Sequence, residues 1–550
     1  MHRRKTAWII MVVLAGSAGI IGLAFATAAS GRGIGARSGI GTCLTISQIP
    51  ANEEMDKQVP NSLPVPNPLN LRQGLPSAAR GQNAPAAEAS DAKIERILSN
   101  LTPSLHLKGR PVVTSTVAAR MAALKIPAVS IAVTRDSRIE WTRAYGFRDV
   151  EEKLPATPET LFQAASISKP VAAAAALHFV DRGVLGLDED VNAKLSSWKV
   201  PENSFTAKQK VTLRRILSHS AGLTVHGFAG YPAGEPLPAL RQILDGEPPA
   251  NSAPIRVNLL PGFRWRYSGG GFTVLQQLLV DVIGRPFPDI MKEIVLDPAG
   301  MTESAYAQPL PDRLLSRAAA GYTSDGTPVG GRRHVYPELA AAGLWTTPAD
   351  LCKFALEIAA ARDGRSDKVL SQKTAQAMLT IEKAPSGLGF MLDGMGADVR
   401  FSHSGGNAGF LCDLVFFPER GAGMAVMTNS ENGSALIAEI ERAIAAEYGL
   451  PAFRPVIEKE IVPMDAAALE RFAGNYEIDF EGQKTPVTIA VKDDHLAATA
   501  ADSLREIYPE SEMSFFAMDL SLSLLFLKDA GGRITGFIVD GTYPAKRTDK

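Results

Sequence analysis

The chain has 550 residues, which is too long for one ordinary domain and indicates two or three parts. Hydrophobic residues make up 45% and charged residues 21%, so most of the chain can build a packed core. The formal net charge of -1, with no long run of Lys and Arg beyond the N-terminus, argues against nucleic acid as a partner.

The first 29 residues have the pattern of an export signal. A basic stretch at residues 2–5 precedes an apolar run from Ala7 to about Ala29, and residues 26–28 (ATA) offer the small side chains that a signal peptidase needs. The run is nearly long enough to span a bilayer, so both a cleaved signal and an uncleaved anchor are open, and we favour cleavage. In either case we expect an exported protein, periplasmic or extracellular.

Residues 30–93 are rich in Gly, Ala, Pro, Ser and Asn and have no hydrophobic period, which predicts a flexible tether. The chain has three cysteines, Cys43, Cys352 and Cys412, without a CxxC pair, so they indicate neither a metal site nor a redox dithiol. We expect Cys352 and Cys412 to be small buried apolar side chains.

Ordered structure is predicted over residues 94–450. An apolar, β-branched strand at 127–134 and its partner at 138–145 form a hairpin. Three antiparallel strands are expected over 401–429, with alternate residues of the second strand facing opposite sides. Helices are predicted at 171–180, 212–218, 272–282, 347–358 and 434–448. This pattern predicts an α+β fold, an antiparallel sheet flanked by helices with a helical subdomain.

The sequence pattern changes after residue 450. Residues 451–463 are proline-rich and indicate a linker, and residues 464–550 contain short strand signals separated by turns. We expect a small antiparallel β-barrel there, and it contains no catalytic constellation. The strand signals lie at 474–478, 486–491, 514–520, 523–528 and 535–539.

Three segments carry chemistry. Ser166 and Lys169 lie three residues apart at the start of an Ala-rich helix, so they share one face, and a partly desolvated lysine can remove a serine proton. Tyr267 precedes another helix in a Gly-rich loop, where it can relay protons if cations hold its pKa down. Residues 401–410 (FSHSGGNAGF) open a strand with small residues, along whose edge a substrate can lie.

Together these segments resemble the serine β-lactamase and penicillin-binding-protein superfamily, particularly its class C-like branch of esterases and D-amino-acid peptidases. The SxxK motif is matched at Ser166–Lys169, the Tyr-x-Asn motif in part at residues 267–269, and the His-x-Gly motif at residues 403–405. Residues 217–223 (LSHSAGL) and 340–351 (AAAGLWTTPADL) are also similar to family segments. The resemblance covers about residues 94–450, and the terminal region resembles a β-barrel appended to many such hydrolases.

The resemblance implies Ser166 as nucleophile, Lys169 as general base and Tyr267 as the residue that passes protons to the leaving group. His403 would orient the substrate or support Tyr267, while His219 is expected to be structural. The substrate would lie along Ser404, Gly405 and Gly406, and the oxyanion hole would be formed by the backbone N–H groups of Ser166 and Gly406. No metal and no cofactor are expected.

One departure bears on the substrate. Gly269 stands where the family has the asparagine that contacts the substrate's acyl amide, which puts β-lactam and peptide turnover in doubt. The leading hypothesis is therefore a hydrolase of carboxylic esters or related acyl compounds, acting on a small-molecule ester or amide that can be derived from the cell wall. The alternatives are a D-amino-acid peptidase or β-lactamase, and a non-catalytic penicillin-binding-like sensor. Contact with a membrane is expected only through the N-terminal segment, if it stays uncleaved.

Overall fold

The computed structural model describes residues 84–451, 454–480, 483–500, 503–518 and 522–549. The predicted export signal, Cys43 and most of the predicted tether lie outside these residues. Helix α2 (Ala84–Ser99) begins within the region predicted to be a tether, so the boundary at residue 94 is set too late. Ile94, Ile97 and Leu98 of α2 are buried in the core that also includes α14 (Ser434–Tyr448), and this packing stabilises a helix that periodicity alone did not indicate.

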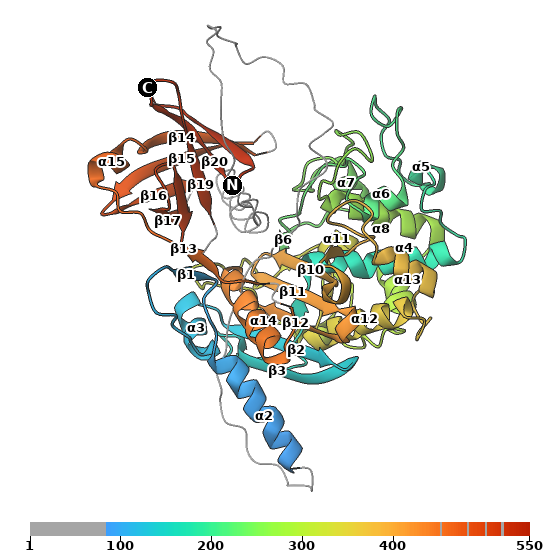
Figure 1. The fold of residues 1–550 in the computed structure, drawn as a ribbon. Coiled ribbons are helices and arrows are strands. Elements are labelled where there is room, and N and C mark those ends of the chain that lie inside the picture. Colours follow the sequence, from blue (N-terminus) through green and yellow to red (C-terminus); the bar gives the residue numbers. More distant parts are fainter. Residues whose placement is uncertain (1–83, 452–453, 481–482, 501–502, 519–521, 550) are drawn as a thin grey trace, which may run out of the picture.

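A seven-stranded antiparallel sheet forms the centre of the hydrolase part, in the order β4-β3-β2-β12-β11-β10-β9 (Figure 1). The predicted hairpin of β2 and β3 is confirmed, and its turn residues Asp136 and Ser137 both have positive φ, as a tight hairpin turn requires. The strands are β2 (Ala128–Arg135), β3 (Arg138–Asp149), β4 (Leu154–Pro155), β9 (Met391–Asp393), β10 (Arg400–Asn407), β11 (Phe410–Phe417) and β12 (Ala422–Thr428).

The two faces of the sheet contribute to separate hydrophobic cores. Phe410, Cys412, Leu414 and Phe416 of β11 join the larger core, which the helical part completes, whereas Val415 and Phe417 join the core under α2 and α14. The predicted alternation along this strand is therefore confirmed. Cys352 and Cys412 are both free and buried, as expected.

The helices that cover the first face lie to the right of the sheet in Figure 1 and include those predicted at 171–180, 212–218, 272–282 and 347–358. The helix predicted at 434–448 is α14, which covers the opposite face. Several short helices and turns join the helices of the first face into a helical subdomain. These helices are α4 (Ser168–Asp181), α5 (Val191–Lys194), α6 (Leu213–Leu217), α7 (Leu240–Asp245), α8 (Gly269–Ile283), α9 (Phe287–Met291), α10 (Asp312–Leu315), α11 (Leu339–Ala342), α12 (Pro348–Arg362) and α13 (Gln372–Met378). Helix α3 (Val117–Leu124) lies on the other side of the sheet. Among the described residues, none of the helices is long and apolar enough to cross a bilayer.

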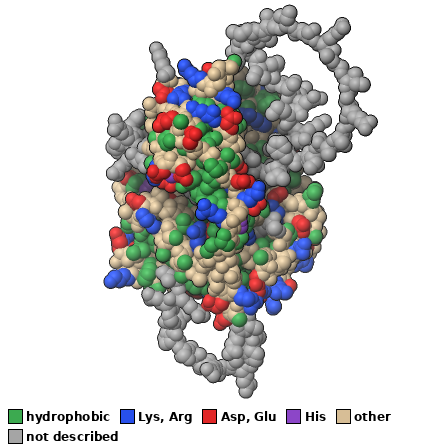
Figure 2. Space-filling view, turned by 60° about the vertical axis from the view of Figure 1, so that its left-hand side comes forward, with side chains coloured by type: hydrophobic (Ala, Val, Ile, Leu, Met, Phe, Trp, Pro, Cys, Tyr) green, Lys and Arg blue, Asp and Glu red, His purple; other side chains and the backbone are tan. Residues whose placement is uncertain are grey.

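The C-terminal region is a closed eight-stranded antiparallel barrel, which confirms the predicted fold of this region. Its interior is filled by apolar side chains such as Tyr476, Phe526 and Phe537. On the face shown in Figure 2, acidic and basic side chains are mixed over the barrel, in agreement with ion pairs such as Lys492–Glu506. The strands are β14 (Gly474–Phe480), β15 (Gln483–Lys492), β16 (His495–Ala500), β17 (Ser503–Pro509), β18 (Ser514–Ala517), β19 (Ser523–Lys528), β20 (Ile534–Val539) and β21 (Tyr543–Arg547).

The segment between the two parts is attached to the hydrolase part. β13 (Ile457–Lys459) pairs in parallel with β1 (Leu105–Leu107), and Arg454 is buried between two carboxylates. Arg454 donates to Glu441 of α14 at 2.7 Å and forms an ion pair with Asp413 of β11. Burial raises the pKa of both carboxyl groups, and the charge of Arg454 opposes that rise.

We expect Arg454→Met to lower the free energy of unfolding by about 3–5 kcal/mol, because it leaves two buried carboxyl groups without their cation. Urea unfolding of the full chain measures the change. Arg420→Met is the matched control, since it removes an ion pair with Asp398 in which both side chains are exposed, and it should cost less than about 1 kcal/mol. Equal losses in the two variants would show that the buried cluster does not hold this segment in place.

Candidate active site

Ser166 lies just before the start of helix α4. It belongs to a short 3-10 turn, Ala165–Ile167, that leads directly into the helix. Ala165 has a φ of 47°, a left-handed conformation that is uncommon outside glycine, and its carbonyl accepts a hydrogen bond from the Ser168 hydroxyl. The sharp turn leaves Ser166 half-buried among residues that are fully buried, so its hydroxyl is accessible at the start of the helix.

Lys169 is brought against Ser166, as the three-residue spacing predicts. Its ammonium nitrogen Nζ lies 2.9 Å from Ser166 Oγ and 2.8 Å from the carbonyl oxygen of Ala341, and the residue is only 2% exposed. Burial lowers the pKa of Lys169 to about 7, because the charged form loses its hydration. A large fraction of the molecules therefore carries a neutral amine near neutral pH, and a neutral amine can accept the serine proton.

The rate of hydrolysis should rise as the pH passes through about 7 and then level off, because Lys169 must lose its proton before it can act as a base. The measurement is kcat/KM for a nitrophenyl ester from about pH 5 to about pH 9, corrected for spontaneous hydrolysis. A profile that is flat or that falls with rising pH over this range would contradict the assignment of Lys169 as the base.

Tyr267 lies on the other side of the serine, in the loop before α8. Its side chain is half-buried and shares a hydrogen bond with the Ser166 side chain, and Lys169 Nζ lies 4.9 Å from the centre of its ring. Burial raises the pKa of Tyr267 well above its ordinary value, and the hydrogen bond with Ser166 opposes this only in part. The condition stated in the sequence analysis, that cations hold this pKa down, is therefore not met. Tyr267 is a neutral phenol that can donate a proton.

Aromatic and imidazole rings surround Tyr267. His219 stacks on it at 4.3 Å between ring centres, with 27° between the ring planes, while His226 lies at 4.9 Å and His403 at 6.2 Å. Nδ1 of His219 accepts a hydrogen bond from the Ser268 backbone N–H at 3.1 Å, which fixes the ring and agrees with a structural role. Packing from several sides therefore holds the phenol against the serine.

His403 lies on β10 and is 3% exposed. Its Nδ1 lies 2.7 Å from the carbonyl oxygen of Ser404, so Nδ1 carries the proton and Nε2 is left as an acceptor, for which the described residues offer no donor. Burial, and then the nearby charge of Lys169, lower the pKa of His403 to about 3, so the ring is neutral. The structure thus places His403 near Tyr267 through ring packing, without a hydrogen bond between them.

Strand β10 supplies an open edge beside the serine. β9 pairs with it only over Arg400–Ser402, and in the described residues no strand pairs with the outer edge of 403–407. Ser404 and Gly406 are exposed along this edge, whereas Gly405 is buried. A Cβ atom at Gly405 would lie 2.2 Å from the Ala164 carbonyl oxygen, so only glycine lets the strand approach the turn that carries Ser166 this closely.

Several supporting groups were not identified as site residues from the sequence. The Ala341 carbonyl accepts a hydrogen bond from Lys169, and the Leu344 backbone N–H donates to Ser168 Oγ at 3.0 Å, so the segment at residues 340–351 supports both residues. Asn407 donates to Gln163 at 2.7 Å and ties β10 to the strand before the serine. Backbone groups leave no residue-type signal, and a lone Asn or Gln is too common to indicate such a contact.

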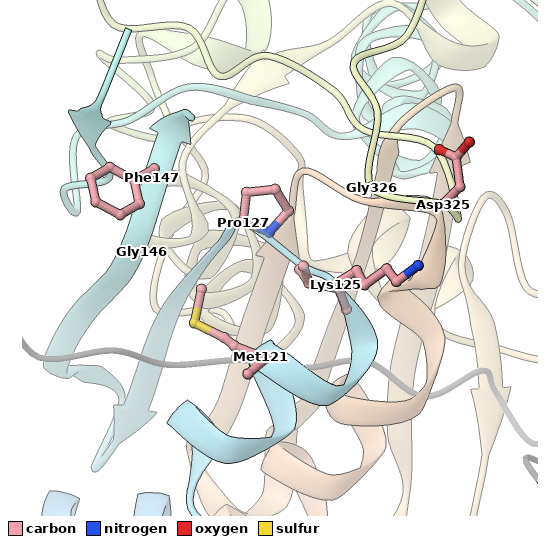
Figure 3. A pocket seen from close by; sticks show the side chains of 9 residues that line it. Met121, Lys125, Pro127, Gly146, Phe147, Asp325 and Gly326 are labelled. Atoms are coloured by element: carbon pink, nitrogen blue, oxygen red, sulfur yellow. The ribbon is translucent and has the colours of Figure 1, made fainter. Parts of the chain in front are cut away.

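A surface pocket elsewhere in the protein is distinct from this site. It is a shallow, open depression of about 380 Å³ between the end of α3 and the β2–β3 hairpin. Lys125 and Asp325 lie at its edge, and none of the candidate catalytic residues lines it (Figure 3). We therefore place the chemistry at Ser166 and not in this pocket.

A half-buried serine bonded to a desolvated lysine and to a tyrosine, beside an open strand edge, defines a serine hydrolase site. The chain belongs to the β-lactamase family, since the family model "Beta-lactamase" matches residues 113–447.

Relatives in this family have different named activities. Penicillin-binding protein 4* of Bacillus subtilis (strain 168) is 25% identical over 420 residues, covering 70% of this chain and 87% of that protein. Esterase EstB of Burkholderia gladioli is 31% identical over 198 residues, covering 34% of this chain and 49% of the esterase. The D-aminopeptidase of Brucella anthropi is 25% identical over 328 residues, covering 57% of this chain and 58% of that protein.

Among solved structures, the octameric penicillin-binding protein homologue from Pyrococcus abyssi has a TM-score of 0.53 at 22% identity. The match covers 78% of this chain and 98% of that chain. This likeness shows a shared fold.

Proposed function

We propose that the protein hydrolyses carboxylic esters through an acyl-enzyme formed on Ser166. One observation carries this proposal: the Ser166 hydroxyl is hydrogen bonded both to a lysine with a pKa of about 7 and to a neutral tyrosine. A serine hydroxyl is a weak nucleophile until a base removes its proton, and a buried neutral amine at 2.9 Å is such a base. The phenol supplies the acid that a leaving group needs.

The proposed acylation step combines this geometry with the oxyanion hole that the resemblance to the family implies. The neutral amine of Lys169 takes the proton of Ser166 while Oγ attacks the ester carbonyl, and the negative charge that forms on the carbonyl oxygen is stabilised by backbone N–H groups of Ser166 and Gly406. The C–O bond to the leaving group then breaks, and Tyr267 donates its proton to the departing alkoxide and regains one from the Lys169 ammonium. Water attacks the acyl-enzyme by the same proton transfers and releases the acid.

The preference for esters rests on Gly269. The amine of an amide must be protonated as it leaves, and the family's asparagine holds the acyl amide of such substrates, whereas an ester needs less help of both kinds. Without that asparagine, a bound amide loses a polar partner, which costs about 1–3 kcal/mol. The relative named as an esterase supports this substrate class, and the relative named as a D-aminopeptidase supports the alternative.

Tyr267→Phe should reduce ester turnover by roughly a hundredfold or more, the usual scale of general acid–base catalysis. The substitution keeps the ring that packs against His219, so the fold should be unchanged. The loss should be smaller for a nitrophenyl ester than for an alkyl ester, because nitrophenolate leaves without a proton. Full activity of Tyr267→Phe on an alkyl ester would show that the tyrosine only packs.

The substrate class is tested by the ratio of kcat/KM for a nitrophenyl ester to that for a chromogenic cephalosporin. We expect the ester to be strongly preferred by the wild-type protein. Preference for the cephalosporin would overturn the ester assignment in favour of a β-lactamase, and preference for D-amino amides would favour a peptidase.

A further inference from the structure

The segment at residues 224–228 covers the position from which the family's second-motif asparagine would project. The first helical residue of α8 is Gly269, and its backbone N–H donates to the carbonyl oxygen of His226 at 2.9 Å. A Cβ atom at Gly269 would lie 3.0 Å from that oxygen and 3.1 Å from the ring of Phe228. A side chain at residue 269 could therefore extend only by pushing this segment away.

Hydrogen bonds to the helix hold the segment in place. The N–H groups at the start of an α-helix have no partners within the helix, and here two of them are satisfied by the segment. Gly270 donates to the carbonyl oxygen of Val225 at 3.0 Å, and the Ser268 hydroxyl donates to that of Thr224 at 2.9 Å. Val225 has a φ of 65°, which is rare for a β-branched residue. A strained backbone held by this many bonds indicates a fixed position for the next residue, His226.

His226 is the exposed member of the three histidines around Tyr267, since His219 and His403 are both buried. Its ring centre lies 4.9 Å from that of Tyr267, and its two nitrogens have no hydrogen-bond partner among the described residues. Desolvation by the surrounding protein, and then the charge of Lys169, lower the pKa of His226, so the ring is neutral near neutral pH. A neutral imidazole has one N–H donor and one nitrogen acceptor to offer to a bound molecule.

We propose that His226 is a specificity-determining residue that hydrogen bonds an oxygen in the acyl part of the substrate. The inference rests on the proposed ester hydrolysis and names a feature of its substrates: an oxygen near the scissile carbonyl. The geometry supports it because a ring in contact with Tyr267, which itself bonds the nucleophile, borders the space where the acyl group must lie.

Two nitrophenyl esters of nearly equal shape test this role. Butyrate has an apolar acyl chain, and methoxyacetate replaces one methylene of that chain by an ether oxygen that can accept a hydrogen bond. The variant His226→Phe keeps an aromatic ring beside Tyr267 but has no polar atom. We expect it to lower kcat/KM for methoxyacetate about five- to tenfold more than for butyrate, mainly through KM, since one neutral hydrogen bond is lost.

Two further variants complete the experiment. His226→Gln retains a donor at similar reach and should restore part of the preference for methoxyacetate. His106→Phe makes the same change on strand β1 and should leave the ratio of the two esters unaltered. An equal fall for both esters in His226→Phe, or no fall for either, would overturn the inference and leave a packing role or none.

The same experiment tests the proposed ester hydrolysis independently of the role of His226. Wild-type hydrolysis of either ester, lost in Ser166→Ala, supports the acyl-enzyme whatever His226 does. If the wild-type protein cleaves neither ester, the ester hydrolase assignment is wrong and the inference about His226 falls with it.

Discussion

Replacing Ser166 with alanine should reduce ester turnover by roughly a thousandfold or more, because a site without its nucleophile keeps only binding and oxyanion stabilisation. The hydroxyl of Ser166 bonds only to Lys169 and Tyr267 among the described residues, so the substitution removes no contact outside the site. The measurement is kcat under substrate saturation, with the melting temperature recorded for both proteins.

A second serine substitution serves as the control for this variant. Ser196 is exposed, and its side chain makes no hydrogen bond in the described part of the chain, so Ser196→Ala should retain full activity. Residual turnover of Ser166→Ala above about a tenth of the wild-type value would place the nucleophile elsewhere.

Replacing Lys169 with methionine should be nearly as damaging as the loss of Ser166, because the nucleophile and its base act as one unit. Methionine is similar in length and is suited to a buried site, so it removes the amine without leaving a large cavity. The substitution destabilises the protein because the Ala341 carbonyl loses its hydrogen-bond donor. It also stabilises the protein because no amine is buried any longer, and the two effects oppose each other. We therefore expect an inactive protein that remains folded.

The rate of labelling by a fluorophosphonate separates the two roles. The Lys169→Met protein still has the Ser166 hydroxyl, so labelling should be slow but still located on Ser166, whereas Ser166→Ala should not be labelled at all. Wild-type labelling rates in Lys169→Met would show that another group activates the serine.

The sequence was sufficient to predict the parts of the site that depend on short-range spacing. Ser166 and Lys169 are three residues apart at a helix start, and this spacing alone places the two side chains in contact. The two faces of β11 follow from alternation of apolar residues, and the hairpin at Asp136–Ser137 follows from its turn residues.

The features that the sequence did not predict depend on long-range packing. The pKa of Tyr267 is raised by burial among rings from distant segments, so the position of this tyrosine in a loop does not indicate the direction of the shift. The second half of α2 packs in one core with α14, more than three hundred residues later in the chain, so the sequence around it does not indicate this helix. Strands β16, β17 and β21 lack runs of β-branched residues and are extended because the closed barrel pairs them on both sides.

The role of residues 224–228 also depends on long-range packing and was not predicted from the sequence. Gly269 was identified as a departure from the family motif, but the fact that His226 and Phe228 cover its position depends on the backbone path of a loop. That path is set by hydrogen bonds to the start of α8, which no local pattern specifies.

Mass spectrometry of a covalent adduct identifies the nucleophile of this protein directly. The full chain is treated with a fluorophosphonate, digested, and the modified peptide is sequenced, with Ser166→Ala treated in parallel. We expect one phosphonylated residue, Ser166, and no adduct in the variant. An adduct on Ser168 or Ser220, or ester turnover by a protein that forms no adduct, would contradict the assignment of Ser166 as the nucleophile.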